Sequence, residues 1–393
     1  MTNISDLMRL GHEVRLFTRI SPYTTLDDCL KFYRKQGIDV RLIPWQTRKM
    51  LRYRIRDVAF VNGVSWEFGK PDFLDGLAQE LTAWTPDVVW CHTGYAWPAA
   101  AFVKKRGVPA IIRSIDYVPI NYALRNQRDR KLSLPLKLLR YWGVLLSEYR
   151  SLQNAAVHVA ITPVEQKLYQ NLRPKSNVQV LPLRVLPQLV RKEPRQVTNR
   201  RPLRVYFMAT KYTAKHNLVA LKFILEEIIP RVRQRCAGAF EFHILGQRVP
   251  PEMLTQAASD VIFDGYVPDL DAHLANMDIA LVPSVVGVGM QQKVFESLCR
   301  GFPTLTYARG LSGFRFEHGK NILLEEDADG FVDQLSSLQD SAFRETIGAN
   351  ALRRCAELFS QGNFDRRLSD ILQAAVNPAL KASSTSIWTF NEN

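Results

Sequence analysis

Short apolar runs alternate along the chain with longer segments in which apolar residues recur every three or four positions. The runs fit buried strands of a parallel sheet, and the longer segments fit helices that cover its faces. In the first half, the predicted strands are 11–18, 40–44, 86–92, 107–113, 157–162 and 178–182, and the predicted helices are 4–11, 46–58, 73–84, 94–105 and 163–171. This rhythm predicts an α/β fold.

The second half repeats the rhythm after a break. Predicted strands are 203–208, 240–246, 261–267, 279–282 and 304–307, and predicted helices are 218–233, 270–276, 291–300, 331–338 and 341–358. The break is rich in Pro, Arg and Gln and shows no periodicity, which is typical of a linker. The predicted organisation is a first domain at 1–186, a linker at 187–202, a second domain at 203–375 and a tail at 376–393.

A glycine loop with Gly287 and Gly289 joins the predicted strand 279–282 to a helix that carries Lys293 and Glu296 on one polar face. Backbone N–H groups at a helix start attract an anion, and Lys293 adds a full positive charge there. Glu296, one turn later, is placed to accept hydrogen bonds from two sugar hydroxyls. A nucleotide fits both features, and an ordinary amphipathic helix with a solvated face fits the spacing equally well.

This stretch resembles the donor-site segment of retaining glycosyltransferases of family 4, which have the GT-B fold. The matching residues are Pro283, Gly287, Gly289, Met290, Lys293, Val294, Glu296, Gly301 and Pro303. The resemblance implies two Rossmann-like domains facing a cleft, with Glu296 on the nucleotide ribose. Many members have a second Glu eight positions earlier, where this chain has Val288.

A second part of the donor site is expected in the loop 209–217. The family has an Arg there, followed five residues later by a Lys, and both hold the donor diphosphate. Lys215 matches the Lys, Thr210 stands in place of the Arg, and Lys211 is a candidate to compensate. Gly246, at the end of the next strand, completes the predicted donor site. Lysines in a loop are otherwise usually just solvated.

On the acceptor side the resemblance points to His92 and Asp116. His92 ends a predicted strand and matches the second histidine of a family pattern whose first position is Trp90 here. Asp116 follows the next strand, after Ile115 in place of a histidine. His92 is expected to contact the sugar or acceptor, and His92 and Glu296 are the predicted catalytic residues. A lone histidine is more often structural.

The start of the chain departs from the family, whose members begin with an apolar strand and a glycine-rich loop before the first helix. In the strand order 3-2-1-4-5-6 the first strand lies in the middle, so the strands near Val14 and Val88 are expected each to lack a neighbour. We expect that the natural product carries about 15 more residues, from typical strand and loop lengths. Otherwise the first domain is rearranged and its activity is weak or absent.

The composition of the chain indicates the compartment and the kind of partner that suit the protein. No run reaches the 18 or more apolar residues that span a bilayer, the start lacks a signal peptide, and the five cysteines are scattered. These features favour a reducing compartment, namely the cytoplasm, and argue against a disulfide framework and a zinc site. The net charge of +14 suits an anionic partner.

Residues 125–150 carry seven basic residues against two acidic ones, interleaved with Leu, Tyr and Trp. Such a stretch binds an anionic membrane surface, at the inner face for a cytoplasmic protein. A core-packing helix with a solvated basic face is at least as good an interpretation. Nucleic acid ranks below both, because the chain has no recognised nucleic-acid module.

The predicted function is transfer of a sugar from a nucleotide-diphosphate donor to a glycan or lipid-linked acceptor, with retention. No metal or cofactor is needed, because lysines and a helix start can neutralise the leaving diphosphate. Two alternatives stay open. One is a catalytically impaired nucleotide-sugar-binding protein, suggested by Val288, Thr210, Trp90 and the missing strand. The other is a GT-B sugar-nucleotide epimerase.

Overall fold

The computed structural model describes residues 4–20, 25–43, 63–114, 116–120, 123, 133–255, 258–284 and 289–377. These residues form two compact units. Within the described ranges, the first unit takes in 4–161, 165–181 and the chain from 365, and the second takes in 162–164 and 182–364. The predicted helix 46–58 and the tail from 378 lie outside the described residues.

The first unit follows the predicted alternation of strands and helices, with α2 as an addition that the pattern did not predict. Its elements are α1 (Ile4–Arg9), β1 (Arg15–Arg19), α2 (Leu26–Lys35), β2 (Asp39–Ile43), α4 (Gly63–Glu67), α5 (Pro71–Ala83), β3 (Val89–Cys91), η1 (Gly94–Ala96), α6 (Trp97–Lys104), β4 (Ala110–Arg113), α8 (Leu134–Asn154), β5 (Val157–Ala160), α9 (Pro163–Leu172), β6 (Val178–Val180) and α18 (Gln361–Val376).

The sheet of the first unit is in two pieces. Among the described residues, β1 pairs only with β2, whereas β3, β4, β5 and β6 form a separate parallel sheet in that order. Within the described residues, the strands near Val14 and Val88 therefore each have one edge without a partner strand, as the sequence predicted. Helix α5 packs against both pieces: its Phe73 lies 4.9 Å from Phe17 of β1, between ring centroids, and shares a core cluster with Cys91 of β3.

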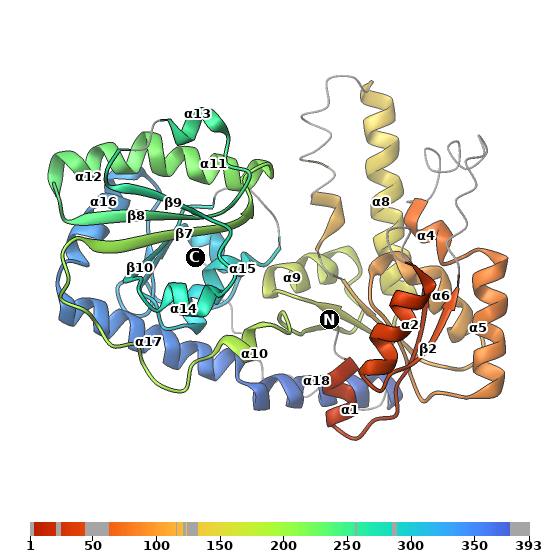
Figure 1. Ribbon diagram of the computed structural model, residues 1–393. Coiled ribbons are helices and arrows are strands. Elements are labelled where there is room, and N and C mark those ends of the chain that lie inside the picture. The colour runs from red at the N-terminus through yellow and green to blue at the C-terminus, as the bar shows by residue number, and fades with distance from the viewer. Residues whose placement is uncertain are drawn as a thin grey trace. The chain divides into compact units, whose positions relative to one another are not determined.

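The second unit has one six-stranded parallel sheet with the order β12-β11-β10-β7-β8-β9. Its strands are β7 (Leu203–Lys211), β8 (Phe240–Gln247), β9 (Val261–Gly265), β10 (Ile279–Val282), β11 (Thr304–Thr306) and β12 (Leu323–Leu324). The chain proceeds from β7 to the β9 edge and then returns to the other side of β7 with β10. The direction of winding thus reverses between β7 and β10 (Figure 1).

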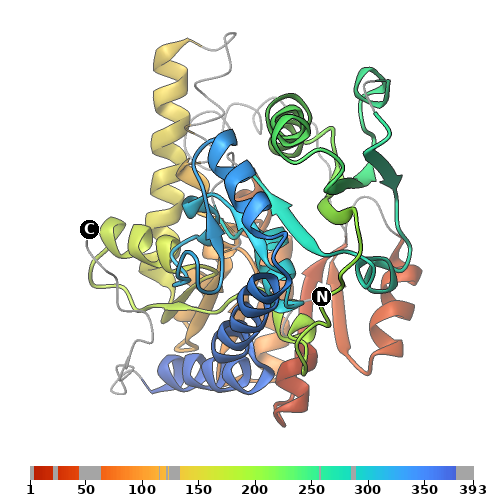
Figure 2. The same ribbon diagram turned by 90° about the vertical axis from the view of Figure 1, so that its left-hand side faces the viewer.

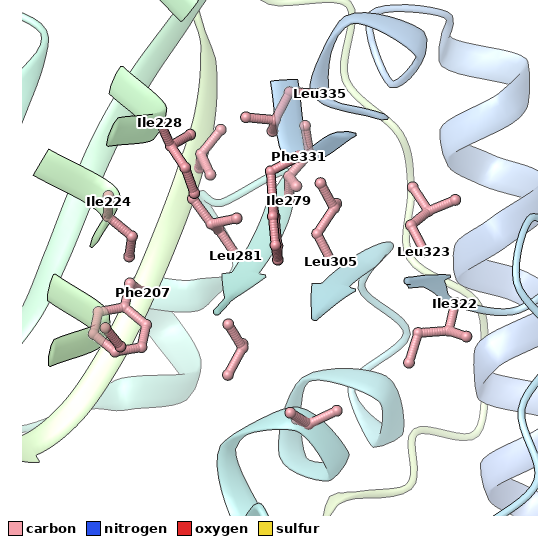
Figure 3. Packing of buried hydrophobic residues seen from close by; sticks show 14 of the residues in the cluster. Phe207, Ile224, Ile228, Ile279, Leu281, Leu305, Ile322, Leu323, Phe331 and Leu335 are labelled. Carbon is pink, nitrogen blue, oxygen red and sulfur yellow. The ribbon is translucent and has the colours of Figure 1, made fainter. Parts of the chain in front are cut away.

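Helices cover both faces of this sheet, as expected for a Rossmann-like domain. They are α10 (Leu186–Leu189), α11 (Lys215–Phe223), a π-helical turn (Ile224–Ile228), α12 (Ile229–Arg235), α13 (Pro251–Leu254), α14 (Leu270–Leu274), α15 (Gln292–Cys299), η3 (Ala308–Leu311), α16 (Ala328–Ser337) and α17 (Ser341–Phe359). Figure 3 shows Phe207 and Leu281 of the strands beside Ile224 and Ile228 of the π turn, with Phe331 of α16 in the same cluster.

The other face of the sheet packs on α14, where Leu274 joins Tyr206 and Phe302 in a second cluster. Residues 187–202, predicted as a linker, are bound to this part of the second unit. Arg195 donates from Nη2 to the carbonyl of Leu274 at 3.0 Å, and its guanidinium lies 3.8 Å from the ring centroid of Phe302. These contacts of Arg195 hold the segment on the second unit. Apolar periodicity does not predict them, because they are made by an arginine.

Candidate functional site

The reversal between β7 and β10 places two helix starts at one edge of the second unit's sheet. Strands β7 and β10 are parallel neighbours, so their carboxyl ends face the same edge, which is where ligands bind in open α/β sheets. Helix α11 follows β7, and α15 follows β10. Within the described residues no side chain caps either helix, although in α15 the N–H groups of Gln292 and Val294 donate to the carbonyls of Met290 and Gln291. The positive ends of both helix dipoles face this edge, which favours an anion there.

Lys293 lies at this edge, and Asn217 ties it to β7. The ammonium of Lys293 donates to Oδ1 of Asn217 at 2.6 Å, while Nδ2 of Asn217 donates to the carbonyl of Lys211 at 2.9 Å. Lys293 also lies 5.1 Å from the ring centroid of Phe207. Asn217 is buried and was missed by the sequence analysis; a polar residue in the first turn after a lysine-rich loop is the signal that would have found it.

Lys293 is a largely buried cation with no carboxylate in ion-pair range among the residues that the structure describes. Burial lowers the pKa of Lys293 to about 8. An ammonium in this setting is stabilised by any anion that binds beside it, because the anion supplies the missing opposite charge. The geometry therefore favours a phosphate or diphosphate ligand.

The residues predicted beside Lys293 lie partly in a strand and not in a loop. Strand β7 continues through Thr210 to Lys211, which pairs with Gln247 across an irregularity in the register. Lys215 is the first residue of α11. The side chains of Thr210, Lys211 and Lys215 are all exposed. The two lysines lie at the same edge as Lys293, so the three predicted cations of the donor site share this edge.

Gly246 brings the end of β8 against β7. Its φ is +133°, and a Cβ atom there would lie 2.0 Å from the carbonyl oxygen of Ala209, so only glycine fits. Tyr212, which the sequence analysis missed, fastens the same region: its hydroxyl donates to the carbonyl of Leu245 at 2.9 Å, and its backbone N–H donates to Gln247. The turn from β7 to α11 is thereby fixed on β8.

In the glycine loop, the structure describes the residues from Gly289 onward. Gly287 and Val288 lie outside the described residues. Gly289 has a φ of +107°, and its carbonyl accepts a 2.7 Å hydrogen bond from Oγ of Ser312. Met290 packs against the core, and Val294 is fully buried within it. Ser312 thus holds the loop at the start of α15, although no sequence motif had pointed to it.

Glu296 follows Lys293 by one turn, and its carboxylate is bonded on its own helix. Oε1 accepts from Nε2 of Gln292 at 2.5 Å, and Oε2 lies 3.7 Å from Nη1 of Arg300. Arg300 is buried and also donates to Asp271 at 3.0 Å. The exposed Gln292 amide is the contact that a ligand could displace, while Arg300 keeps the carboxylate in place.

In the first unit, His92 and Asp116 follow the neighbouring parallel strands β3 and β4, at their carboxyl ends. Burial, reinforced by the charge of Arg113, lowers the pKa of His92 to about 4, so the imidazole is neutral at pH 7. Burial raises the pKa of Asp116 to about 6. A neutral imidazole can both donate and accept a hydrogen bond, as a sugar hydroxyl requires.

A buried carboxyl lies under the turn that follows His92. A Cβ atom on Gly94 would lie 3.6 Å from Oε2 of Glu148 and 3.4 Å from Oγ of Ser114. Burial raises the pKa of Glu148 to about 8, so it is largely protonated at pH 7. Glu148 belongs to the stretch 125–150, and the basic pattern of that stretch does not predict a buried carboxyl.

Two family models match the chain. Residues 3–184 match the glycosyl transferase 4-like domain, and residues 204–341 match the glycosyl transferases group 1 domain. The two matches correspond to the two compact units and leave 185–203 between them. A comparison with curated proteins finds no match.

Solved structures of similar fold share little sequence with the chain. A glycosyltransferase from Rickettsia africae has a TM-score of 0.63 and 11% identity, with 95% of this chain and 92% of that one covered. Anabaena HepE in complex with UDP and glucose has a TM-score of 0.61 and 14% identity, with 92% of this chain and 100% of that one covered. TarM from S. aureus has a TM-score of 0.56 and 12% identity, with 76% of this chain covered. This chain spans only 58% of the length of TarM. The two domain matches, together with the GT-B fold, show that the chain belongs to the glycosyltransferase family.

Proposed function

We propose that the chain transfers a sugar from a nucleoside-diphosphate donor to a glycan or lipid-linked acceptor, with retention of the anomeric configuration. The observation that carries the proposal is Lys293, a largely buried cation without a described counter-charge, between two uncapped helix starts. The leaving diphosphate develops charge as the sugar departs, and fixed positive groups at that position stabilise the transition state. Lys211 and Lys215 add exposed positive charge at the same edge, so the transfer needs no metal.

Glu296 and His92 take the remaining roles. Glu296 accepts hydrogen bonds from the ribose hydroxyls in place of the Gln292 amide. His92 hydrogen-bonds the sugar or the acceptor as a neutral imidazole, with Asp116 on the acceptor side. Retention is inferred from the family resemblance of the segment 282–306.

A second candidate, a nucleotide-sugar-binding protein with impaired catalysis, is favoured by one structural observation. The first unit's sheet is divided between β1 and β3 within the described residues. This unit carries His92 and Asp116, so an incomplete sheet there weakens acceptor chemistry without touching the donor residues of the second unit.

Thermal unfolding with a panel of nucleotide sugars, combined with a turnover assay, tests these functions. We take UDP and UDP-glucose as first probes, because the HepE structure holds UDP and glucose. A ligand at about 100 times its Kd should add about 2.7 kcal/mol of stability. A transferase also releases the nucleoside diphosphate when acceptor is added. Stabilisation without release indicates the binding protein, and conversion of the donor sugar without acceptor indicates the epimerase. If no nucleotide sugar stabilises the chain, the donor site is refuted.

We further propose that α8 docks the first unit on an anionic membrane. Its exposed apolar residues recur along one stripe, with 68% of Leu134, 50% of Leu138 and 62% of Trp142 accessible. Lys137 and Arg140 lie among them. The opposite face of α8 is buried, and the N-terminal end of the helix projects from the four-stranded sheet (Figures 1 and 2). No helix among the described residues is long and apolar enough to cross a bilayer.

Vesicle sedimentation tests this docking. Binding to anionic vesicles should fall steeply with salt, because exposed charges are screened over about 8 Å at physiological ionic strength. Leu138→Ser with Trp142→Ser should weaken binding at least tenfold, since burying each side chain contributes about 1.5–3 kcal/mol. The matched control is Tyr266→Ser, which removes an aromatic residue that is 68% exposed in the second unit. Equal binding to neutral vesicles, or an equal loss in the control, contradicts the docking.

A further inference from the structure

Two histidines and an aspartate meet on the face of the second unit's sheet that α14 covers. His243 comes from β8, Asp264 from β9 and His273 from α14. Their nearest ring nitrogens and carboxylate oxygens all lie within 4.8 Å of one another. The side chains of His243 and Asp264 are 7% and 11% exposed, and that of His273 is 26% exposed, so the cluster opens to solvent only past His273.

The spacing of the donor atoms suits a tetrahedral metal ion. Nδ1 of His243 lies 3.1 Å and 3.2 Å from the two oxygens of Asp264, and Nε2 of His273 lies 3.4 Å from Oδ1 of Asp264. Two ligands that are each 2.0–2.1 Å from a zinc ion at a tetrahedral angle are about 3.3 Å apart. The two histidines therefore flank the carboxylate at the separation of ligands around one ion.

His273 has a ring nitrogen that the protein leaves unsatisfied. Its Nε2 atom is buried and has no hydrogen-bond partner among the described residues, although it lies 3.4 Å from Oδ1 of Asp264. A buried polar atom without a partner destabilises the fold. A bound ion removes this destabilisation, because the lone pair of Nε2 becomes a ligand.

A second carboxylate orients His243. Nε2 of His243 lies 2.8 Å from Oε1 of Glu241, which also accepts from Nε of Arg204 at 3.1 Å. Nδ1 of His243 faces Asp264 instead. With an ion bound at Nδ1, Glu241 would keep the remaining proton on Nε2, which is the carboxylate–histidine–metal arrangement of many metal sites. The matched Arg204 charge holds Glu241 in this position.

We propose that His243, Asp264 and His273 bind one zinc ion, with water in the fourth position on the solvent side. The site has no cysteine ligand, so the scattered cysteines, which argued against a zinc site, could not reveal it. Two imidazoles and one carboxylate favour zinc over magnesium or calcium, which prefer oxygen ligands alone. The ion joins the short helix α14 to β8 and the edge strand β9, and its role is to stabilise this side of the sheet. It uses none of the residues assigned to the donor or acceptor, so it takes no part in sugar transfer.

The test is zinc titration of the full chain after removal of metals with a chelator. One zinc ion per chain should bind, and the unfolding midpoint should rise with zinc but not with magnesium. His273→Gln should weaken zinc binding at least tenfold, because even the loss of an outer partner costs about 10- to 100-fold. The matched control is His12→Gln, which removes an exposed histidine of the first unit and should bind zinc like the wild type.

Cobalt as a spectroscopic probe keeps the site testable if the variant fails to fold. The wild-type chain with one equivalent of Co²⁺ should show the strong visible absorption of a tetrahedral centre. Absence of zinc binding, equal affinity in His273→Gln and the wild type, or only the weak absorption of six-coordinate cobalt would overturn the site. None of these readouts depends on transferase activity, so a failed donor assay leaves the zinc result intact.

Discussion

Replacing Lys293 by alanine should lower turnover of the nucleotide sugar about 100- to 1,000-fold, because removing one preorganised group that faces developing charge has this effect in other enzymes. The wild-type ammonium is fixed by Asn217 at 2.6 Å and has no described carboxylate partner. The fold should survive, because removing a charge whose pKa burial lowers to about 8 relieves a desolvation cost. Steady-state kinetics measures the loss of turnover, and calorimetric titration with UDP measures the accompanying loss of affinity.

The pH dependence of the same site provides a second readout. Only protonated Lys293 attracts the diphosphate, and its pKa of about 8 in the free protein places the change just above neutrality. Affinity for UDP should therefore fall as pH rises above 8, and Lys293→Ala should lack this dependence. The control is Lys222→Ala, which removes an exposed lysine in the last turn of α11. Wild-type turnover in Lys293→Ala would refute the donor-site assignment.

Glu148→Gln should stabilise the first unit by about 4 kcal/mol at pH 8 and have little effect at pH 4, from 1.36 kcal/mol per pKa unit. Burial raises the pKa of Glu148 from 4.5 to about 8, so the folded state keeps a proton that the unfolded chain has lost. Its stabilisation of the fold is complete below pH 4.5 and is lost as pH rises to about 8. Glutamine stays neutral throughout, so the variant should lack this loss.

Chemical denaturation at pH 4 and pH 8 measures this difference in the free energy of unfolding. Glu13→Gln is the matched control, because Glu13 is 69% exposed and its neutralisation should change little at either pH. An equal stability change at both pH values in Glu148→Gln would show that folding does not raise the pKa of Glu148.

Much of the fold was readable from local pattern. The apolar runs at 203–208, 240–246 and 279–282 became β7, β8 and β10, because a strand buried on both faces needs a continuous apolar sequence. The glycine loop and Lys293 pointed to the same edge of the sheet, because a helix that follows a parallel strand starts at that strand's carboxyl end. The open edges of β1 and β3 within the described residues were also predicted, since the first strand of a doubly wound sheet lies in the middle of the strand order.

The two-residue strand β12 and the extension of β7 to Lys211 were not predicted. Leu323 and Leu324 form a strand only because β11 lies beside them. Lys211 continues β7 only because Gln247 of β8 pairs with it. A polar or very short segment becomes a strand through its neighbour, and its own sequence carries no sign of that neighbour.

The sequence by itself determined the order of strands and helices along the chain, the parallel character of the sheets and the place of Lys293 after a strand and a glycine loop. Only the tertiary structure decided which side chains hold the site: Asn217 reaches Lys293 across 76 positions, and Ser312 reaches Gly289 across 23. It also buried Glu148 inside a stretch that reads as basic. Periodicity reports contacts within about one turn or one pleat, whereas burial and long-range hydrogen bonds depend on which distant segments pack together.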